Sequence, residues 1–220
     1  FSSPTTALIL NKNKFILHFI PKKNNTKPKL VADLPLNTAS FTNHIKSVSS
    51  HQKNCPITIY SNSQNQYLIG GCFNRSLGEQ RRSLAIRNAA PVVTAIITKK
   101  LAQLHVHFSS IEVGLEAPNA AKTIATHQSQ SLIRIIKTML KNSDNLISNS
   151  LLKTIGHYYF HQTGNWQSGL RALKKILSPL TGINFKNTRI TDGAGLSRYN
   201  LIQPKQVIKL LDAIQKNPIL

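Results

Sequence analysis

The sequence predicts an α/β fold in which a β-rich first part is followed by a mostly helical second part. Before residue 71, short runs of β-branched and aromatic residues are separated by turn-forming residues, a pattern typical of strands. After residue 91, apolar residues recur at three- and four-residue spacing, which indicates helices with one buried face. We therefore expect one unit over residues 1–110 and a second over residues 111–220.

The first strands are predicted from apolar runs near the N-terminus. Ala7–Leu10 and Phe15–Ile20 are rich in strand-forming residues, and Asn11-Lys12-Asn13 between them favours a turn. The next stretch, Pro21–Pro35, is polar and rich in lysine and proline. We interpret it as a surface loop or connector. Ser40–Ser50 shows only weak alternation, so its structure stays open.

Cys55 and Cys72 flank a predicted hairpin. Ile57–Tyr60 and Tyr67–Gly70 are strand-like, and Ser61–Gln66 between them is turn-prone. Such a hairpin can bring the two sulfurs together as a disulfide, which would indicate an oxidising compartment, whereas two free buried thiols explain the same pattern. No Cys-x-x-Cys pair or His-spaced cluster accompanies them, so we expect no metal site.

Helices are predicted in the remaining chain. Leu84 and Ile86 begin a run with helical spacing, and Pro91 can open the longer helix because the first helical turn needs no N–H at that position. Another amphipathic helix should end at Pro179 and Gly182. The other stripes cover residues 132–142, 146–155 and 204–214.

Charge limits the possible partners. Lys and Arg number 28 against 7 Asp and Glu, a net charge of +21, so nucleic acid, an acidic membrane surface and an anionic wall polymer all qualify. The positive residues are scattered, however, and a general compositional bias explains them as well. The few acids disfavour a paired-carboxylate site or a carboxylate-rich metal site. No apolar run is long enough to span a membrane.

The triplet Ser143-Asp144-Asn145 lies where one predicted helix ends and the next begins. These residue types favour caps and turns over helix interiors, so helix capping explains the triplet taken alone. It also presents a hydroxyl and a carboxamide two residues apart at a turn between buried helices. A catalytic role for this triplet therefore needs the support of further motifs.

Such motifs are present downstream. Leu-Leu-Lys-Thr-Ile-Gly covers residues 151–156, Gly-Asn-Trp-Gln-Ser-Gly covers residues 164–169, and Asp-Gly-Ala-Gly-Leu-Ser-Arg covers residues 192–198. In order and interval these strings resemble the penicillin-binding domain of D-alanyl-D-alanine carboxypeptidase/endopeptidases, the class C low-molecular-mass penicillin-binding proteins. Ala194 replaces a serine that is usual in that family. The resemblance implies a partial serine β-lactamase/penicillin-binding (transpeptidase-like) fold, with residues 1–110 as the later part of a β-rich insertion.

The resemblance also implies a serine acyl-transfer mechanism without a cofactor. Ser143 would take part in proton transfer, and Asn145 would orient the substrate peptide and the essential lysine. Arg198, with a planar guanidinium that suits a carboxylate, would bind substrate, and Asp144 is a further candidate there, although it more readily fixes the turn. The expected partners are peptidoglycan stem peptides and, for the full-length parent, β-lactams, in the bacterial periplasm.

The other two motifs of that family are expected elsewhere. Ser50-His51-Gln52-Lys53 spells Ser-x-x-Lys, but it precedes a hairpin instead of opening an apolar helix, so we interpret it as coincidence. Lys153-Thr154 is followed by Ile, not Gly, on a predicted helix. Because the chain also opens without Met, we expect an internal fragment that is inactive alone. The alternative is a non-catalytic basic module that binds anionic cell wall or nucleic acid; under the enzyme hypothesis we expect no nucleic-acid partner.

Overall fold

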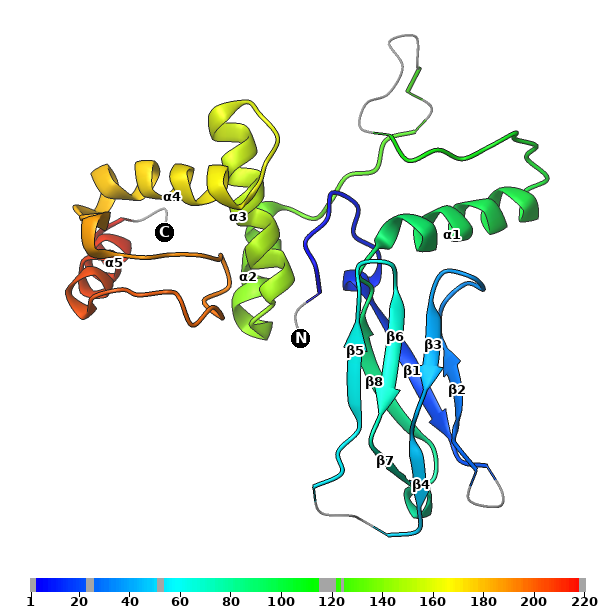
Figure 1. Cartoon of the computed structure of the whole chain (residues 1–220). Coiled ribbons are helices and arrows are strands. Elements are labelled where there is room, and N and C mark those ends of the chain that lie inside the picture. The colour runs from blue at the N-terminus through cyan, green and yellow to red at the C-terminus, as the bar shows by residue number, and fades with distance from the viewer. Residues whose placement is uncertain (1–2, 23–25, 51–53, 115–121, 124, 218–220) are drawn as a thin grey trace. The chain divides into compact units, whose positions relative to one another are not determined.

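The computed structural model describes residues 3–22, 26–50, 54–114, 122–123 and 125–217. They form a mixed α/β structure of small sheets and helices (Figure 1), as the sequence predicts. The chain divides into two compact units, Phe1–Ala125 and Thr126–Leu220, and each is described by itself. The boundary between the two units follows Ala125. Helix α1 (Ala89–Gln103) belongs to the first unit and packs on the strands that precede it.

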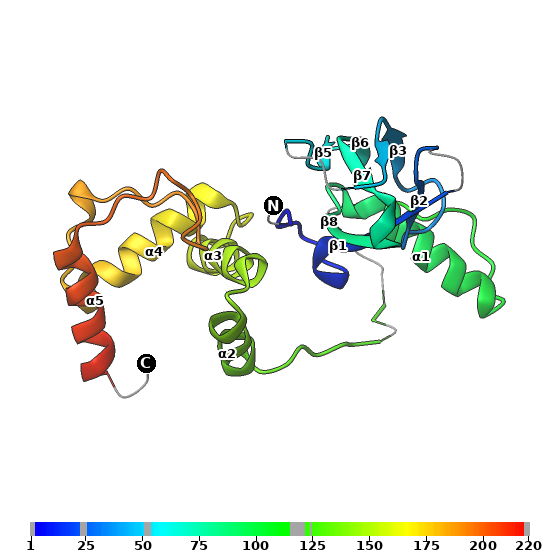
Figure 2. The same ribbon diagram turned by 90° about the horizontal axis from the view of Figure 1, so that it is seen from below.

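Unit 1 contains three small sheets within its described residues. The first has the order β2-β1-β8 and is antiparallel, the second has the order β3-β6-β5, and the third is the parallel pair β4-β7. Viewed from below, the first two sheets lie in two layers (Figure 2). The strands are β1 (Lys14–Ile20), β2 (Lys29–Ala32), β3 (Ser40–Asn43), β4 (Lys46–Val48), β5 (Thr58–Ser61), β6 (Gln66–Gly70), β7 (Cys72–Asn74) and β8 (Gln80–Ala85).

The core of unit 1 lies between these layers. Alternate residues of β1 point inward, so Phe15, Leu17 and Phe19 are all buried, as the period of two in a strand requires. The ring of Phe15 meets the ring of Tyr67 from β6 edge-on, with centroids 5.3 Å apart. Val92 adds the buried face of α1 to this cluster.

Three local predictions for unit 1 were wrong. Ala7–Leu10 forms no strand, because the chain there wraps around Asn13, whose buried amide donates to Pro4 O and Thr6 Oγ1. Strand β2 lies inside the segment expected to be a loop and pairs with β1. Leu84, where the predicted helical run begins, lies in strand β8 and not in a helix, because pairing with β1 overrides its helix-like spacing.

The hairpin predicted between the two cysteines is confirmed. β5 pairs with β6 in antiparallel register, with Ile59 opposite Ile69. Cys55 and Cys72 are joined by a disulfide, with their Cα atoms 5.3 Å apart. Gly71 between β6 and β7 has a φ of 93°, and a Cβ there would lie 2.0 Å from Pro56 O, so this crossing requires glycine.

Unit 2 contains four α-helices within its described residues: α2 (Leu132–Asn142), α3 (Asn145–Phe160), α4 (Trp166–Thr181) and α5 (Pro204–Lys216). Helices α3 and α4 pack closely at two glycines, because a Cβ on Gly156 would lie 2.4 Å from Gly169 N. Helix α4 continues past Pro179 and ends where Gly182 takes a left-handed conformation, so only the second of its two predicted stop signals ends it. Among the described residues, no helix has the length and apolar character needed to cross a membrane.

Candidate active site

The triplet Ser143-Asp144-Asn145 forms the turn between α2 and α3. Ser143 has left-handed dihedral angles, φ 49° and ψ 48°, which are uncommon for a residue with a Cβ. The turn is closed by the N–H of Asp144, which donates to Met139 O at 2.9 Å. The sequence prediction of helix ends at this point is confirmed, and the unusual conformation of Ser143 was not foreseen.

The carboxylate of Asp144 caps α3. Its Oδ1 accepts hydrogen bonds from the backbone N–H groups of Leu146 at 3.1 Å and Ile147 at 3.2 Å. These N–H groups have no partner within the helix, so the cap satisfies them, and the negative charge also suits the helix N-terminus. Asp144 thus fixes the direction in which α3 leaves the turn.

The side chains on either side of Asp144 are free of such bonds. Within the part of the chain that the structure describes, neither the Ser143 hydroxyl nor the Asn145 carboxamide makes a hydrogen bond. Ser143 is exposed and Asn145 is half-buried at the first position of α3. The turn therefore holds a hydroxyl and an amide that retain their hydrogen-bonding capacity.

The loop of residues 191–200 is organised around Asp192. Its two carboxylate oxygens accept hydrogen bonds from the backbone N–H groups of Gly195, Leu196 and Ser197 and from the amide of Asn200. Partial burial alone would raise the pKa of Asp192, but the hydrogen bonds from Asn200, Ser197, Gly195 and Leu196 outweigh it and lower that pKa. The loop is thus stabilised by a charged aspartate.

This loop docks on α3, one turn beyond the triplet. The Ser148 hydroxyl donates to Gly193 O, and Gly193 N–H donates to Asn149 Oδ1 at 2.9 Å. A Cβ on Gly193 would lie 2.8 Å from Ser148 O, so the close approach requires glycine. The structure therefore fixes two of the sequence motifs, the triplet and the Asp-Gly-Ala-Gly-Leu-Ser-Arg loop, to one helix.

Arg198, the predicted substrate-binding arginine, lies near the C-terminal end of this loop. Its side chain is exposed, and it forms no ion pair or hydrogen bond with the described residues. Nearby, the guanidinium of Arg189 lies over the ring of Tyr199 at 5.3 Å. Of these two arginines, Arg198 is the one whose charge has no partner of its own among the residues described.

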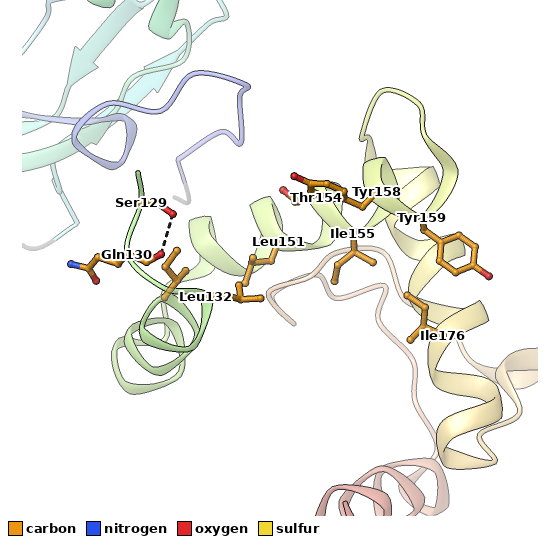
Figure 3. Close-up of a pocket in the computed structure, with 10 residues that line it drawn as sticks. Ser129, Gln130, Leu132, Leu151, Thr154, Ile155, Tyr158, Tyr159 and Ile176 are labelled. Carbon is orange, nitrogen blue, oxygen red and sulfur yellow. Dashed lines mark hydrogen bonds between the residues drawn. The ribbon is translucent and has the colours of Figure 1, made fainter. Parts of the chain in front are cut away.

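A groove of about 650 Å³ runs along the opposite end of α3 (Figure 3). Leu151, Ile155 and Tyr158 of α3 line it, together with Leu132 of α2 and Ile176 of α4. Its lining is mostly apolar, and none of the four predicted catalytic or substrate-binding residues is part of it. The predicted catalytic and substrate-binding residues therefore lie outside this groove.

Our sequence interpretation missed a second Ser-x-x-Lys, formed by Ser150 and Lys153 on α3. Ser150 Oγ is buried without a hydrogen-bond partner among the described residues. Lys153 Nζ lies 4.6 Å from the centre of the Trp166 ring, and burial lowers the pKa of this lysine. A nucleophile must be reached by its substrate, and the enclosed Ser150 does not meet that requirement. Of the other string, Ser50–Lys53, residues 51–53 lie outside the described residues.

The sequence interpretation also missed how the motifs meet. It followed the apolar positions of α3 and ignored the polar ones at Asn145, Ser148 and Asn149. Spacings of three and four place these residues on one helix face, and that spacing was the available signal. The loop of residues 191–200 packs where this face ends. Within the described ranges, no cluster of three or more His, Cys, Asp or Glu residues could hold a metal ion.

Comparison with known proteins gives consistent matches. The sequence model of the D-Ala-D-Ala carboxypeptidase 3 (S13) family matches residues 1–220. The chain is 30% identical over 220 residues to D-alanyl-D-alanine carboxypeptidase DacB of Haemophilus influenzae, covering 99% of this chain and 45% of the relative. It is 35% identical over 91 residues to a D-alanyl-D-alanine carboxypeptidase of Actinomadura sp. strain R39, covering 41% of this chain and 16% of the relative.

The fold matches as well. The crystal structure of penicillin-binding protein 4 (dacB) from H. influenzae, complexed with a β-lactam, superposes with a TM-score of 0.83 at 29% identity, covering 96% of this chain and 49% of the other. A second crystal structure of that protein gives the same TM-score. The chain thus spans about half the length of its H. influenzae relatives, and its partial penicillin-binding fold, predicted from the motifs, is confirmed.

Proposed function

Because this chain belongs to the D-Ala-D-Ala carboxypeptidase 3 (S13) family, we propose that it is part of a serine-type D-Ala-D-Ala carboxypeptidase and endopeptidase. Its substrates would be peptidoglycan stem peptides in the periplasm, and β-lactams would react with the whole protein as substrate mimics. A serine nucleophile would form an ester with the carbonyl of the penultimate D-Ala and break the bond to the terminal D-Ala, which would leave as the amine; water would then hydrolyse the ester and release the shortened peptide. No cofactor is needed for this chemistry.

The observation that carries the proposal is the attachment of the loop of residues 191–200 to α3 through Gly193. It holds Arg198 in a loop fixed to the same helix that begins at Asn145. Acyl transfer depends on groups held in fixed positions relative to each other. A shared rigid helix meets this need better than two independent loops.

The hydrogen bonds of the triplet support the roles that we propose for its three residues. Asp144 is used by the cap of α3, so its contribution to substrate binding would be mainly to orient its neighbours. The unbonded hydroxyl of Ser143 can relay a proton between the nucleophile and the leaving amine. The unbonded amide of Asn145 can donate to a substrate carbonyl and accept from a lysine. Arg198 can bind a stem-peptide carboxylate in a bidentate manner.

We further propose that residues 1–220 alone do not form an acyl-enzyme. Ser150 is enclosed in α3, Ser50 precedes a hairpin, and the sequence contains no Lys-Thr-Gly. A fluorescent penicillin should therefore leave the isolated chain unlabelled. Stoichiometric labelling that disappears in Ser50→Ala or Ser150→Ala would contradict this.

The catalytic roles are tested in a hybrid in which residues 1–220 replace the matching segment of H. influenzae DacB. We expect the hybrid to react with fluorescent penicillin. Ser143→Ala should slow acylation by about 10²-fold or more, the usual contribution of a proton-transfer group. Asn142→Ala, which alters an exposed neighbour, should leave the rate unchanged. Equal acylation rates in the Ser143 and Asn142 variants would remove Ser143 from the mechanism.

The net charge of +21 supports a second candidate, a non-catalytic basic module. The two proposals differ in which material should bind the isolated chain. Binding to DNA-cellulose that weakens steeply as salt rises would indicate a phosphate-driven nucleic-acid contact. Retention on purified peptidoglycan at salt concentrations that release the chain from DNA would favour a cell-wall partner over nucleic acid. Acylation of the hybrid by fluorescent penicillin would then separate the enzyme from a non-catalytic module that binds the wall.

A further inference from the structure

A cleft of about 450 Å³ lies within unit 1, between its two main sheets. One wall includes Ile59, Tyr60 and Ser61 of β5, and the other includes Ser83, Leu84 and Ala85 of β8. Side chains of consecutive residues point to opposite faces of a strand. Three consecutive residues of a strand can therefore line one cleft only if the cleft runs along the edge of that strand. This cleft borders an edge of both strands.

Both of these edges are unpaired in the described structure. β5 is the last strand of the order β3-β6-β5 and pairs only with β6, and β8 is the last strand of the order β2-β1-β8 and pairs only with β1. An unpaired edge presents backbone N–H and C=O groups that can bind a further strand. The cleft thus offers two such edges to one ligand.

The separation of the two edges is fixed by Tyr67. Its ring is buried, and its hydroxyl donates to Ala85 O at 2.7 Å, which joins β6 of one sheet to β8 of the other. Burial raises the pKa of Tyr67 to about 12 despite the nearby charge of Arg87, so the hydroxyl stays a donor at neutral pH. The cleft is held open by a specific bridge between the layers.

Arg87, which lines this cleft, is held in place from two sides. Its backbone N–H donates to Oδ1 of the buried Asn65 at 2.9 Å, and its Nε donates to Ser61 Oγ at 2.9 Å. The terminal NH₂ groups of the guanidinium make no hydrogen bond with the residues that the structure describes. They remain available to an anion in a fixed position, which lowers the entropic cost of binding.

Arg82 adds a second positive charge to the lining. Within the described residues, its guanidinium forms one hydrogen bond, to the carbonyl of Arg81 at 3.2 Å. No described carboxylate forms an ion pair with Arg82 or Arg87, whereas the exposed Arg81 on the same strand pairs with Glu79 at 3.0 Å. The two lining arginines therefore carry a charge that selects an acidic ligand. The same charge disfavours pairing of β8 with a second copy of itself.

We propose that this cleft, with free edges of β5 and β8 and with Arg82 and Arg87 in its lining, binds an extended acidic peptide by strand addition. Backbone hydrogen bonds to an edge would supply much of the affinity, and the arginines would supply the preference for a carboxylate. Isoleucine and leucine side chains in the lining would contact apolar side chains of the same peptide. A polyphosphate or nucleic acid would use the charges but not the strand edges.

The test uses the whole 220-residue chain and a synthetic peptide with a neutral fluorophore, Thr-Val-Glu-Val-Glu-Val, followed by fluorescence anisotropy. A matched peptide with Gln in place of Glu measures the contribution of charge. A third peptide, N-methylated at alternate residues, keeps the charge and removes backbone donors. We expect the Gln peptide to bind about tenfold more weakly, and the N-methylated peptide at least about fivefold more weakly. If all three peptides bind the unaltered chain with equal affinity, the proposal is overturned.

Protein variants locate the contact. Arg87→Gln should weaken binding of the Glu peptide about tenfold, and the more exposed Arg82→Gln about threefold. Arg81→Gln removes the same charge from the same strand outside the lining, and it should have little effect. If the three variants lose affinity for the Glu peptide to the same extent, binding reflects general charge attraction and the proposed site is wrong. Thermal unfolding of each variant excludes misfolding, and the comparison of peptides on the unaltered chain stands even if Arg87→Gln unfolds.

Discussion

The side-chain oxygen of Asn149 accepts a hydrogen bond from the backbone N–H of Gly193 at 2.9 Å, across 44 residues of sequence. The preceding residue, Ser148, binds the carbonyl of the same glycine. Two consecutive helix residues thus satisfy both backbone groups of one loop residue. The position of the loop that carries Arg198 depends on this pair of contacts.

Asn149→Ala should weaken this attachment. Asn149 is 8% exposed, so its removal leaves the Gly193 N–H without its partner and should lower the free energy of unfolding by about 1–3 kcal/mol. Urea unfolding of the chain measures the change. Asn142→Ala, at an exposed position of α2, is the matched control and should cost less than about 0.5 kcal/mol. If both variants unfold at the same urea concentration, the contact contributes nothing to stability.

Asp144 offers a test that separates its capping role from a charge role. Asp144→Ala removes the cap of α3 and should destabilise the chain by about 1 kcal/mol, whereas Asp144→Asn keeps a capping oxygen and should cost much less. Thermal unfolding of both variants gives these differences. In the DacB hybrid, acylation should follow the same order. Slow acylation by Asp144→Asn, with full stability, would instead mean that the charge itself contacts substrate.

The motifs could be recognised from sequence because their residue types are specific and their intervals are fixed. The Ser-Asp-Asn turn and the start of α5 at Pro204 follow from local chemistry, that is, from capping residues and a proline that suits a first helical turn. The resemblance then supplied the fold of unit 2. Local signals of this kind do not depend on distant partners.

Other features depend on contacts that the local sequence does not specify. The chain before β1 wraps around the buried amide of Asn13. No repeating pattern of apolar residues predicts such a contact. β8 has a helix-like apolar spacing at Leu84 but becomes a strand through its partner β1. The docking of Gly193 on α3 likewise needs a helix face and a loop to be known together. The roles of Ser143, Asn145 and Arg198 in catalysis stay predictions.

The hydrogen bonds of Asp192 make loop stability dependent on pH. Because the pKa of Asp192 is lowered in the folded chain, its contribution is fully present above the ordinary aspartate pKa, about 4, and is lost as pH falls through the lower folded value. In the unaltered chain the Asp192 carboxylate accepts hydrogen bonds from backbone N–H groups. Asp192→Asn would place amide hydrogens close to these same donors. After allowance for solvent screening we expect a loss of about 1 kcal/mol at neutral pH.

Urea unfolding of the unaltered chain and of Asp192→Asn at a series of pH values checks this. The difference in free energy of unfolding between the two chains should become smaller as the pH falls below about 4, because protonation removes the charge of Asp192 from the unaltered chain. Asp212→Asn alters an exposed aspartate that pairs with Lys216 on α5 and serves as the control. If the difference in free energy of unfolding between the unaltered chain and Asp192→Asn stays constant with pH, the carboxylate charge does not stabilise the loop.

Ser143 combines a left-handed backbone with a hydroxyl that forms no hydrogen bond with the described residues, and two substitutions separate these properties. Ser143→Gly removes both the hydroxyl and the cost of the left-handed conformation, so it should raise the free energy of unfolding by up to about 1 kcal/mol. Ser143→Ala removes only the hydroxyl and should leave stability within about 0.5 kcal/mol. If the serine is retained for chemistry, both variants should lose acylation in the hybrid, including the glycine variant that is more stable. A glycine variant that is both more stable and fully reactive would show that Ser143 serves neither the turn nor the reaction.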